Sequence, residues 1–178
     1  VQLDRMGRTE EAIECYNKAL EINPHDVRSL FNKGVCLQML GRAEEALRCY
    51  NKALEITPND PEIWSNKGIA LRMLGRLEEA VQCYDRALEL NPNDAGVWSN
   101  KGVALRSLGR TEEAIKCYDR ALQINPQDAG AWSNKGVALH RLGRLKEAIE
   151  CYDRALAIDP NRHVAKRNRE VALRDLSR

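Results

Sequence analysis

The amino-acid sequence repeats itself every 34 residues, and it does so five times. Each copy has a glycine in a Leu-Gly-Arg or Met-Gly-Arg triplet, and a proline follows 17 residues later. The glycines are Gly7, Gly41, Gly75, Gly109 and Gly143, and the prolines are Pro24, Pro58, Pro92, Pro126 and Pro160. A fixed period of this length predicts a solenoid built from one supersecondary unit. Such a chain is expected to bind something along its length rather than to form a closed catalytic pocket.

The repeat over residues 61–94 shows the local structure that we expect in each copy. Pro61 suits a first helical turn, and the Asn-Asp pair before it offers a capping oxygen. Gly75 suits the left-handed residue that ends a helix, and the residue before Pro92 avoids the helical region. The sequence therefore predicts two helices in this repeat, over about 61–74 and 77–90.

Bulky and small apolar residues recur at helical spacing in each repeat. Trp64, Gly68 and Leu71 fall on one face of the first helix, and Ala80 and Tyr84 form the matching face of the second. The small residues are expected to let the helix axes approach closely, with the tryptophan and the tyrosine filling the space around them. The set that resembles the tetratricopeptide repeat is Trp64, Gly68, Leu71, Gly75, Ala80, Tyr84, Ala87 and Pro92.

The resemblance to the tetratricopeptide repeat covers nearly all of the chain. It implies an all-α fold in which antiparallel helix pairs stack into a right-handed superhelical α-solenoid. The second repeat departs once, with Leu30 in the tryptophan position. The expected boundaries are a partial repeat over 1–26, full repeats over 27–60, 61–94, 95–128 and 129–162, and a C-terminal capping helix over 163–178.

The N-terminal copy begins inside a repeat. Gly7 is expected to end a first helix of which residues 1–6 remain, and the second helix is expected from about Thr9 to Ile22. We therefore expect a longer parent protein and weak self-association through this end, because exposed apolar patches tend to find another surface. The apolar side chains concerned are Ala12, Ile13, Tyr16 and Leu20.

The face of each first helix opposite the tryptophan is expected to line a concave groove. Its sixth position is always asparagine: Asn32, Asn66, Asn100 and Asn134. Its ninth position is Val35, Ile69, Val103 or Val137. An amide can pair with the N–H and C=O groups of an extended peptide whatever the peptide's side chains. The row resembles the asparagine ladder of O-linked N-acetylglucosamine transferases; alternatively, these amides stabilise adjacent helices.

Basic residues lie in two rows. Arg72, Arg106 and Arg141 share the groove face and favour acidic ligands, or else form an ordinary solvated face. The second row, Arg8, Arg42, Arg76, Arg110 and Arg144, follows each helix-ending glycine and is expected to pair with nearby carboxylates. Binding of an acidic chaperone tail is not expected, because that clamp needs lysine at the fifth position and asparagine at the ninth.

Several classes of function find no support in the sequence. The formal net charge of +2 is too small to indicate nucleic-acid binding, and no apolar run of about 18 residues could span a membrane. No Ser/His/Asp set, phosphate loop or metal-spaced pair occurs, so we expect no catalytic site, no cofactor and no metal. Five of the six cysteines share one repeat position, on helices too far apart for disulfides, which indicates a reducing cytoplasm.

The favoured interpretation is a non-enzymatic protein–protein interaction scaffold. It would bind an extended, acidic or sequence-tolerant peptide in the concave groove. One alternative is a substrate-recruiting or regulatory segment of a larger enzyme. Another is a self-assembling structural array, because the third to fifth repeats are nearly identical.

Overall fold

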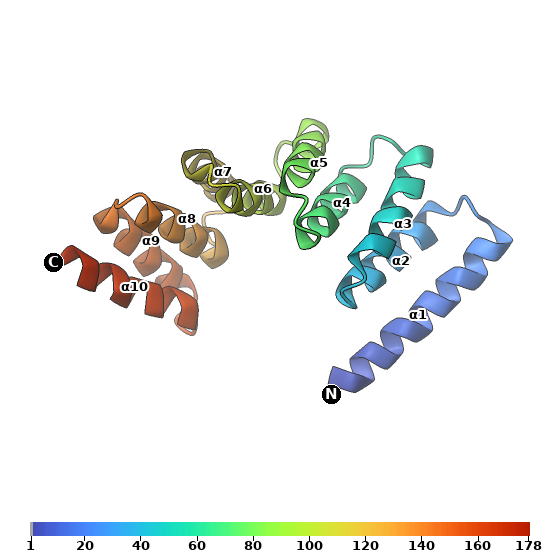
Figure 1. The fold of residues 1–178 in the computed structure, drawn as a ribbon, viewed down its shortest axis with the longest axis horizontal. Helices are drawn as coiled ribbons and strands as arrows, with labels where there is room; N and C mark the ends of the chain where they lie inside the picture. The colour runs from blue at the N-terminus through green and yellow to red at the C-terminus, as the bar shows by residue number, and fades with distance from the viewer. Residues whose placement is uncertain (1) are drawn as a thin grey trace. The chain divides into compact units, whose positions relative to one another are not determined.

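The computed structural model describes the backbone of residues 2–178 and the side chains from Gly7 onward, and over these residues the chain forms ten helices and no strand (Figure 1). The first compact unit extends to Pro92 and holds α1 (Gln2–Ile22), α2 (Val27–Met39), α3 (Ala43–Ile56), α4 (Pro61–Met73) and α5 (Leu77–Leu90). The second compact unit, Asn93–Arg178, holds α6 (Ala95–Ser107), α7 (Thr111–Ile124), α8 (Ala129–Arg141), α9 (Leu145–Ile158) and α10 (His163–Leu176).

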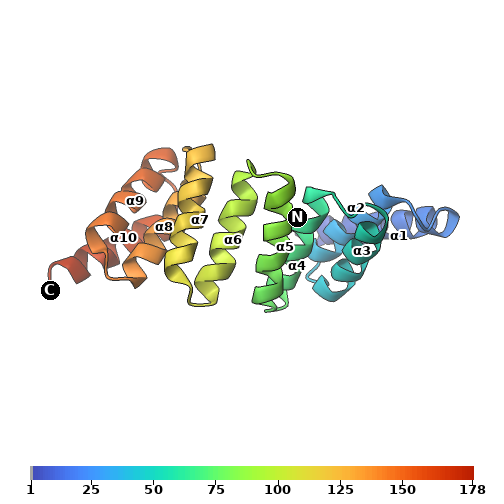
Figure 2. The ribbon, with the colours of Figure 1, turned by 90° about the horizontal axis from the view of Figure 1, so that it is seen from above.

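Within each compact unit, successive helices pack as antiparallel neighbours. In the first unit α2 pairs with α3 and α4 with α5, and in the second α6 pairs with α7 and α8 with α9 (Figure 2). The first helices also touch one another, α2 against α4 and α6 against α8. The all-α fold of helix pairs predicted from the sequence is therefore confirmed, and the last helix, α10, packs on α9.

The ends of the helices follow from the capping residues in the sequence. The Asp60 carboxylate accepts hydrogen bonds from the backbone N–H groups of Glu62 and Ile63, which otherwise lack partners at a helix start. At the other end, Gly75 adopts a φ of 74°, and its N–H donates to the Arg72 carbonyl. The Arg76 N–H then donates to the Leu71 carbonyl, which completes the left-handed cap that only glycine adopts easily.

The helices of a pair are held together by a contact between a glycine and a tyrosine ring. A Cβ atom added at Gly68 would lie 2.6 Å from the nearest ring carbon of Tyr84, so no residue but glycine fits. The same distance recurs in the other full repeats, and all four tyrosines are fully buried. The four pairs are Gly34 with Tyr50, Gly68 with Tyr84, Gly102 with Tyr118, and Gly136 with Tyr152.

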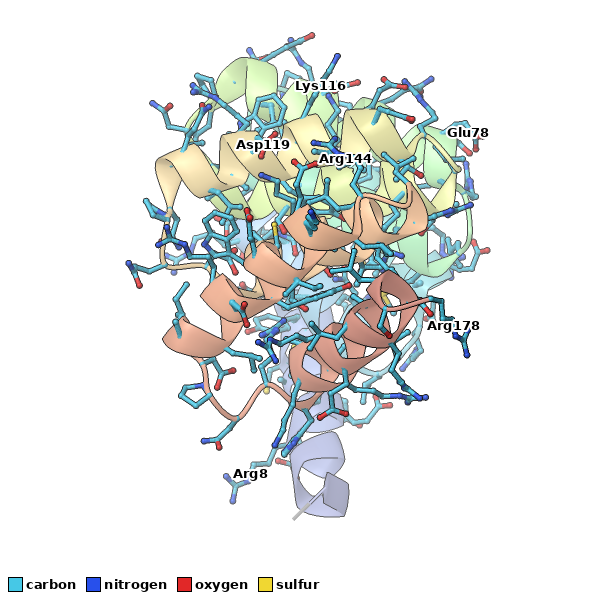
Figure 3. All side chains as sticks on the ribbon, turned by 90° about the vertical axis from the view of Figure 1, so that its left-hand side faces the viewer. Arg8, Glu78, Lys116, Asp119, Arg144 and Arg178 are labelled. Atoms are coloured by element: carbon cyan, nitrogen blue, oxygen red, sulfur yellow. The ribbon has the colours of Figure 1, made fainter. Side chains whose placement is uncertain are left out.

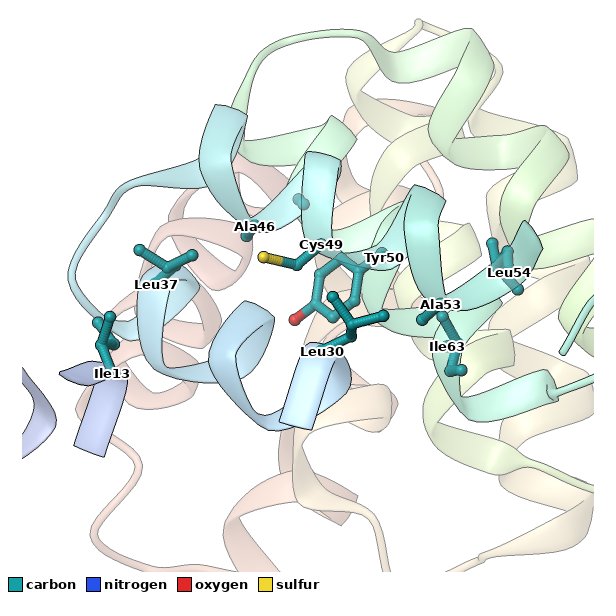
Figure 4. Close-up of a cluster of buried hydrophobic side chains, with 10 residues drawn as sticks. Ile13, Leu30, Leu37, Ala46, Cys49, Tyr50, Ala53, Leu54 and Ile63 are labelled. Carbon is teal, nitrogen blue, oxygen red and sulfur yellow. The ribbon is translucent and has the colours of Figure 1, made fainter. Parts of the chain in front are cut away.

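The core of the first compact unit surrounds one of these tyrosines. Tyr50 lies among Leu30, Leu37, Ala46 and Ala53, and Ile63 extends the cluster to α4 (Figure 4). Trp64 packs against the edge of this cluster and stays partly exposed. The three atoms nearest to a Cβ built at Gly68 all belong to the Tyr84 ring, so the tyrosine makes the tightest contact with the glycine.

The N-terminal helix departs from the sequence prediction. Gly7 does not end a helix: α1 runs without interruption from Gln2 to Ile22. No atom outside the local backbone lies within 4 Å of a Cβ built at Gly7, and this glycine does not adopt a positive φ. With no partner helix to hold a turn at this point, helix propagation continues through the glycine at a cost of about 1 kcal/mol. Val1, which was included in the prediction, lies outside the described residues.

The surface is rich in short-range ion pairs, including the second arginine row. Arg76 and Glu79 lie 2.6 Å apart, and the equivalent pairs follow Gly41, Gly109 and Gly143, as predicted. In the second compact unit Asp119 lies close to Arg144 (Figure 3). Its Oδ1 atom also forms an ion pair with Lys135 Nζ at 2.6 Å. These pairs are exposed or partly exposed to solvent, so each adds little to stability. Among the described residues, no helix combines the length and apolar character needed to cross a membrane.

Candidate peptide-binding surface

Each compact unit has its own candidate surface, formed by α2 and α4 in the first unit and by α6 and α8 in the second. We call this surface the first-helix face and define it by the sixth, ninth, twelfth and thirteenth residues of these helices. The asparagines at the sixth position are all partly exposed, and they occupy equivalent places on helices that touch within each compact unit. The valines and the isoleucine at the ninth position are also partly exposed, one helical turn further along.

The asparagine amides do not all have the same hydrogen-bonding state. The Asn66 Nδ2 group donates to the Glu62 carbonyl at 2.9 Å, so one of its donors serves its own helix. Within the described part of the chain, the side chains of Asn32, Asn100 and Asn134 form no hydrogen bond. Three of the four amides therefore keep their donors and acceptor available at the surface.

In α2, α4 and α6 the twelfth position lies near the hydroxyl end of a buried tyrosine. In α2 the Tyr50 hydroxyl donates to Gln38 Oε1 at 3.1 Å. In α4 and α6 this position is arginine: the Nε of Arg72 and the Nε of Arg106 are buried without a hydrogen-bond partner. The hydroxyls of Tyr84 and Tyr118 are likewise buried without an acceptor. The sequence did not reveal this neighbourhood, because it joins residues 12 positions apart on two different helices.

Burial controls the ionisation of these tyrosines. It raises the pKa of Tyr84 to about 12, although the nearby Arg72 guanidinium works in the opposite direction. It also raises the pKa of Tyr152 to about 12. The phenols therefore stay neutral at pH 7 and act as hydrogen-bond donors, beside a guanidinium that can only donate. Donors without acceptors are matched by carboxylate or carbonyl oxygens.

The second compact unit brings two of the predicted arginines together. The Arg141 Nη1 group donates to the backbone carbonyl of Arg106 at 3.2 Å, and the Arg141 side chain is exposed. A residue that the sequence prediction missed lies on the neighbouring helix: Asp175 of α10 places its Oδ2 2.9 Å from His140 Nε2. Continuing the 34-residue register into α10 would have found Asp175, because it takes the same position as Arg141.

The described residues contain neither a metal site nor a reactive buried thiol. Within the described residues, no group of three His, Cys, Asp or Glu side chains could hold a metal ion. All six cysteines are free thiols, and four of them are buried. Burial raises the pKa of Cys83 and of Cys151 to about 11, so these thiols are protonated and weakly reactive at neutral pH.

Each helix pair is joined by the contact between a glycine and a buried tyrosine ring, which we call the glycine–tyrosine seam. The helix pairs and these seams define the chain as a tetratricopeptide-repeat domain. It belongs to the family described as the Cilia and flagella-associated protein 70 C-terminal domain, whose model matches residues 3–175. No match was found among curated proteins.

Solved structures share the fold. A crystal structure of MamA superposes with a TM-score of 0.81 at 24% sequence identity, over 91% of this chain and 95% of that one. YrrB, described as a TPR protein with an unusual peptide-binding site, superposes with a TM-score of 0.78 at 25% identity. That match covers 95% of this chain and 87% of YrrB.

Proposed function

We propose that the chain is a non-enzymatic interaction scaffold that binds an extended peptide on its first-helix face. The observation that carries the proposal is the row of amides at the sixth position, of which Asn32, Asn100 and Asn134 have no intramolecular hydrogen bond. An extended peptide presents N–H and C=O groups at regular intervals, and such amides can pair with both kinds of group. The description of YrrB as a peptide-binding TPR protein supports the same class of ligand.

The ligand that we propose is acidic or tolerant in sequence. In the second compact unit Arg141 is exposed and Arg106 is partly exposed, and in the first unit Arg72 is partly exposed at the position equivalent to Arg106. Asp175 and His140 form a polar pair at one edge of the second compact unit, so the positive charge there is partly balanced. We therefore expect the backbone to supply most of the affinity and acidic side chains to add a smaller, salt-sensitive part.

A peptide-array screen tests this function directly. Extended peptides in acidic, neutral and basic versions of one sequence should bind in that order, and raising the salt from 0.1 M to 1 M should narrow the difference as the Debye length falls from about 10 Å to about 3 Å. Reversal of Arg141 to Glu should remove the preference while leaving the neutral peptide bound. A screen in which basic peptides bind best, or in which helical peptides alone bind, would contradict the proposal.

The compartment that we propose is the cytoplasm. All six cysteines are free thiols, of which four are buried, and free thiols persist in a reducing environment.

Self-association through α1 remains part of the proposal. Tyr16 takes the repeat position of the four buried tyrosines but stays partly exposed, and Ile22 is 88% exposed. Light scattering across concentration should show weak, reversible dimers that Tyr16→Gln abolishes; a strict monomer at millimolar concentration would refute this part.

A further inference from the structure

A cavity in the first compact unit shares no residue with the first-helix face. It has a volume of about 450 Å³ and lies between α1, α2 and α3. Its apolar lining includes Leu20, Leu30, Leu37 and Cys49, of which the last three are nearly fully buried and belong to the core cluster (Figure 4). Polar side chains such as Lys33 also line it. An apolar lining with a few polar groups is typical of ligand-binding cavities of this size.

The equivalent place in the next repeat holds an indole ring. Trp64 stands 34 residues after Leu30, and its Nε1 group donates to the carbonyl of Pro58 at 2.8 Å. The ammonium of Lys67 lies 4.9 Å from the centre of the ring, a distance typical of a cation–π contact. The next repeat also has a cavity beside its tryptophan, with a volume of about 460 Å³. The residues that line it all belong to α4 and α5, so it has no wall from the preceding helix, α3.

The fifth repeat shows the same arrangement around its tryptophan. The Trp132 Nε1 group donates to the carbonyl of Pro126 at 2.9 Å, and Lys135 lies 5.6 Å from the ring centre. The indole site is thus defined by three groups: an apolar floor, a proline carbonyl that accepts from the ring N–H, and a lysine over the ring face.

The repeat that lacks the tryptophan keeps all three groups. Pro24 is the equivalent of Pro58 and lines the cavity, and its carbonyl accepts no hydrogen bond from the described residues. Lys33 is the equivalent of Lys67, and it lines the cavity as well. Leu30 supplies part of the floor but has no ring and no donor, so the carbonyl and the lysine are left without the group that they hold elsewhere.

We propose that this cavity binds an aromatic side chain of a partner peptide, with indole preferred. The ring would lie over Leu30, its N–H would donate to the Pro24 carbonyl, and the Lys33 ammonium would face the ring. Three cations, Lys33, Arg48 and Lys52, line the cavity against two carboxylates, Glu21 and Glu45. Glu45 is already paired with Arg42 at 2.6 Å, so the rim favours a tryptophan flanked by acidic residues.

A titration with N-acetyl-L-tryptophanamide, followed by NMR of the whole chain, tests the proposal. The backbone and methyl signals of Leu20, Leu30 and Leu37 should shift in a saturable way, with a dissociation constant on the order of 1 mM. N-acetyl-L-leucinamide should bind at least several-fold more weakly, because it has neither the ring nor the N–H donor. No saturable shift at these residues up to about 10 mM probe would overturn the proposal.

Leu30→Trp is the matched variant, because it copies a side chain that three other repeats already accommodate at this position. The variant should fold, as circular dichroism would show, and should lose binding of the probe at this cavity. Unchanged binding in the folded variant would place the probe elsewhere and overturn the proposal. Self-association of the wild-type chain that Leu30→Trp abolishes would identify a second copy as the occupant, and would also overturn it.

Loss of the proposed peptide site would not affect this result. The first-helix face and the cavity share no residue, so variants of the asparagines should leave the probe's affinity within about twofold. Failure of one proposal is therefore distinguishable from failure of the other.

Discussion

The two ends of each buried tyrosine lie in regions that differ in how strictly they repeat. At the ring, the partner is glycine in all four full repeats, and a Cβ added there would lie 2.6 Å from the ring each time. At the hydroxyl, the neighbouring residue changes from repeat to repeat: it is Gln38 beside Tyr50, Arg72 beside Tyr84 and Arg106 beside Tyr118. The tyrosine ring therefore contacts the same residue type in every full repeat, whereas its hydroxyl lies beside different residue types.

The difference separates the residues that build the fold from those available for binding. The seam repeats because two helix axes can come this close only over a glycine, and any larger residue would push them apart. The hydroxyl end borders the first-helix face, where a polar side chain of several kinds can lie beside the phenol. The variation among the repeats therefore indicates that the first-helix face, and not the seam, can differ between repeats to suit a ligand.

The largest effect is expected from a methyl group added to the seam. Gly68→Ala should destabilise the chain by about 1–3 kcal/mol, because overpacking at Tyr84 outweighs the gain in helix propensity. Urea unfolding measures the change. If Gly68→Ala proved as stable as the wild type, the seam would be looser than the contact distance indicates.

Alkaline pH is expected to weaken the seam from the hydroxyl end. The pKa of Tyr84 is about 12 in the folded chain and about 10 when unfolded, so the stabilisation is complete below pH 10 and is lost as the pH rises toward 12. The loss should be about 2 kcal/mol for this group by pH 12, because each pKa unit corresponds to about 1.4 kcal/mol. Buried Cys83, with a pKa raised to about 11, adds a loss that begins near pH 9.

Tyr84→Phe is the control for that pH effect. It removes a hydroxyl that has no acceptor, so stability at pH 7 should change by less than about 0.5 kcal/mol. Chemical unfolding at pH 7 and pH 11 should show a smaller loss in the variant than in the wild type. Equal losses would mean that Tyr84 does not titrate in this range.

A smaller effect, of opposite sign, is expected at the glycine that has no seam. Gly7→Ala should stabilise α1 by about 0.5–1 kcal/mol, because Gly7 is helical and nothing lies within 4 Å of the added methyl. Helix content by circular dichroism and the unfolding midpoint would both rise. Destabilisation would indicate that Gly7 ends a helix after all, as the sequence pattern first indicated.

Local signals allowed most of the fold to be predicted. Pro61 and Gly75 mark helix ends correctly, since α4 ends at Met73 and α5 spans Leu77–Leu90, close to the predicted 61–74 and 77–90. The prediction failed at Gly7, because the same Leu- or Met-Gly-Arg signal ends a helix only where a partner helix holds the turn.

The candidate site was less accessible to sequence reasoning. The row of asparagines follows from the 34-residue period alone, and the structure leaves three of the four amides without a partner. The proximity of Arg72 to Tyr84, and of His140 to Asp175, depends on contacts between helices. Such contacts require the three-dimensional packing, because no periodicity within one helix encodes them.

The most direct test of the central claim is the affinity of a peptide found in the array screen for the double variant Asn100→Ala/Asn134→Ala. Both residues lie in the second compact unit, and each lost hydrogen bond is worth about 0.5–1.5 kcal/mol, so titration calorimetry should show about 5- to 150-fold weaker binding. The loss should be similar for peptides of different sequence, and Asn51→Ala, on the exposed surface of α3, should leave affinity unchanged. Wild-type affinity in the folded double variant would show that these amides serve the helices and would contradict the proposed peptide-binding surface.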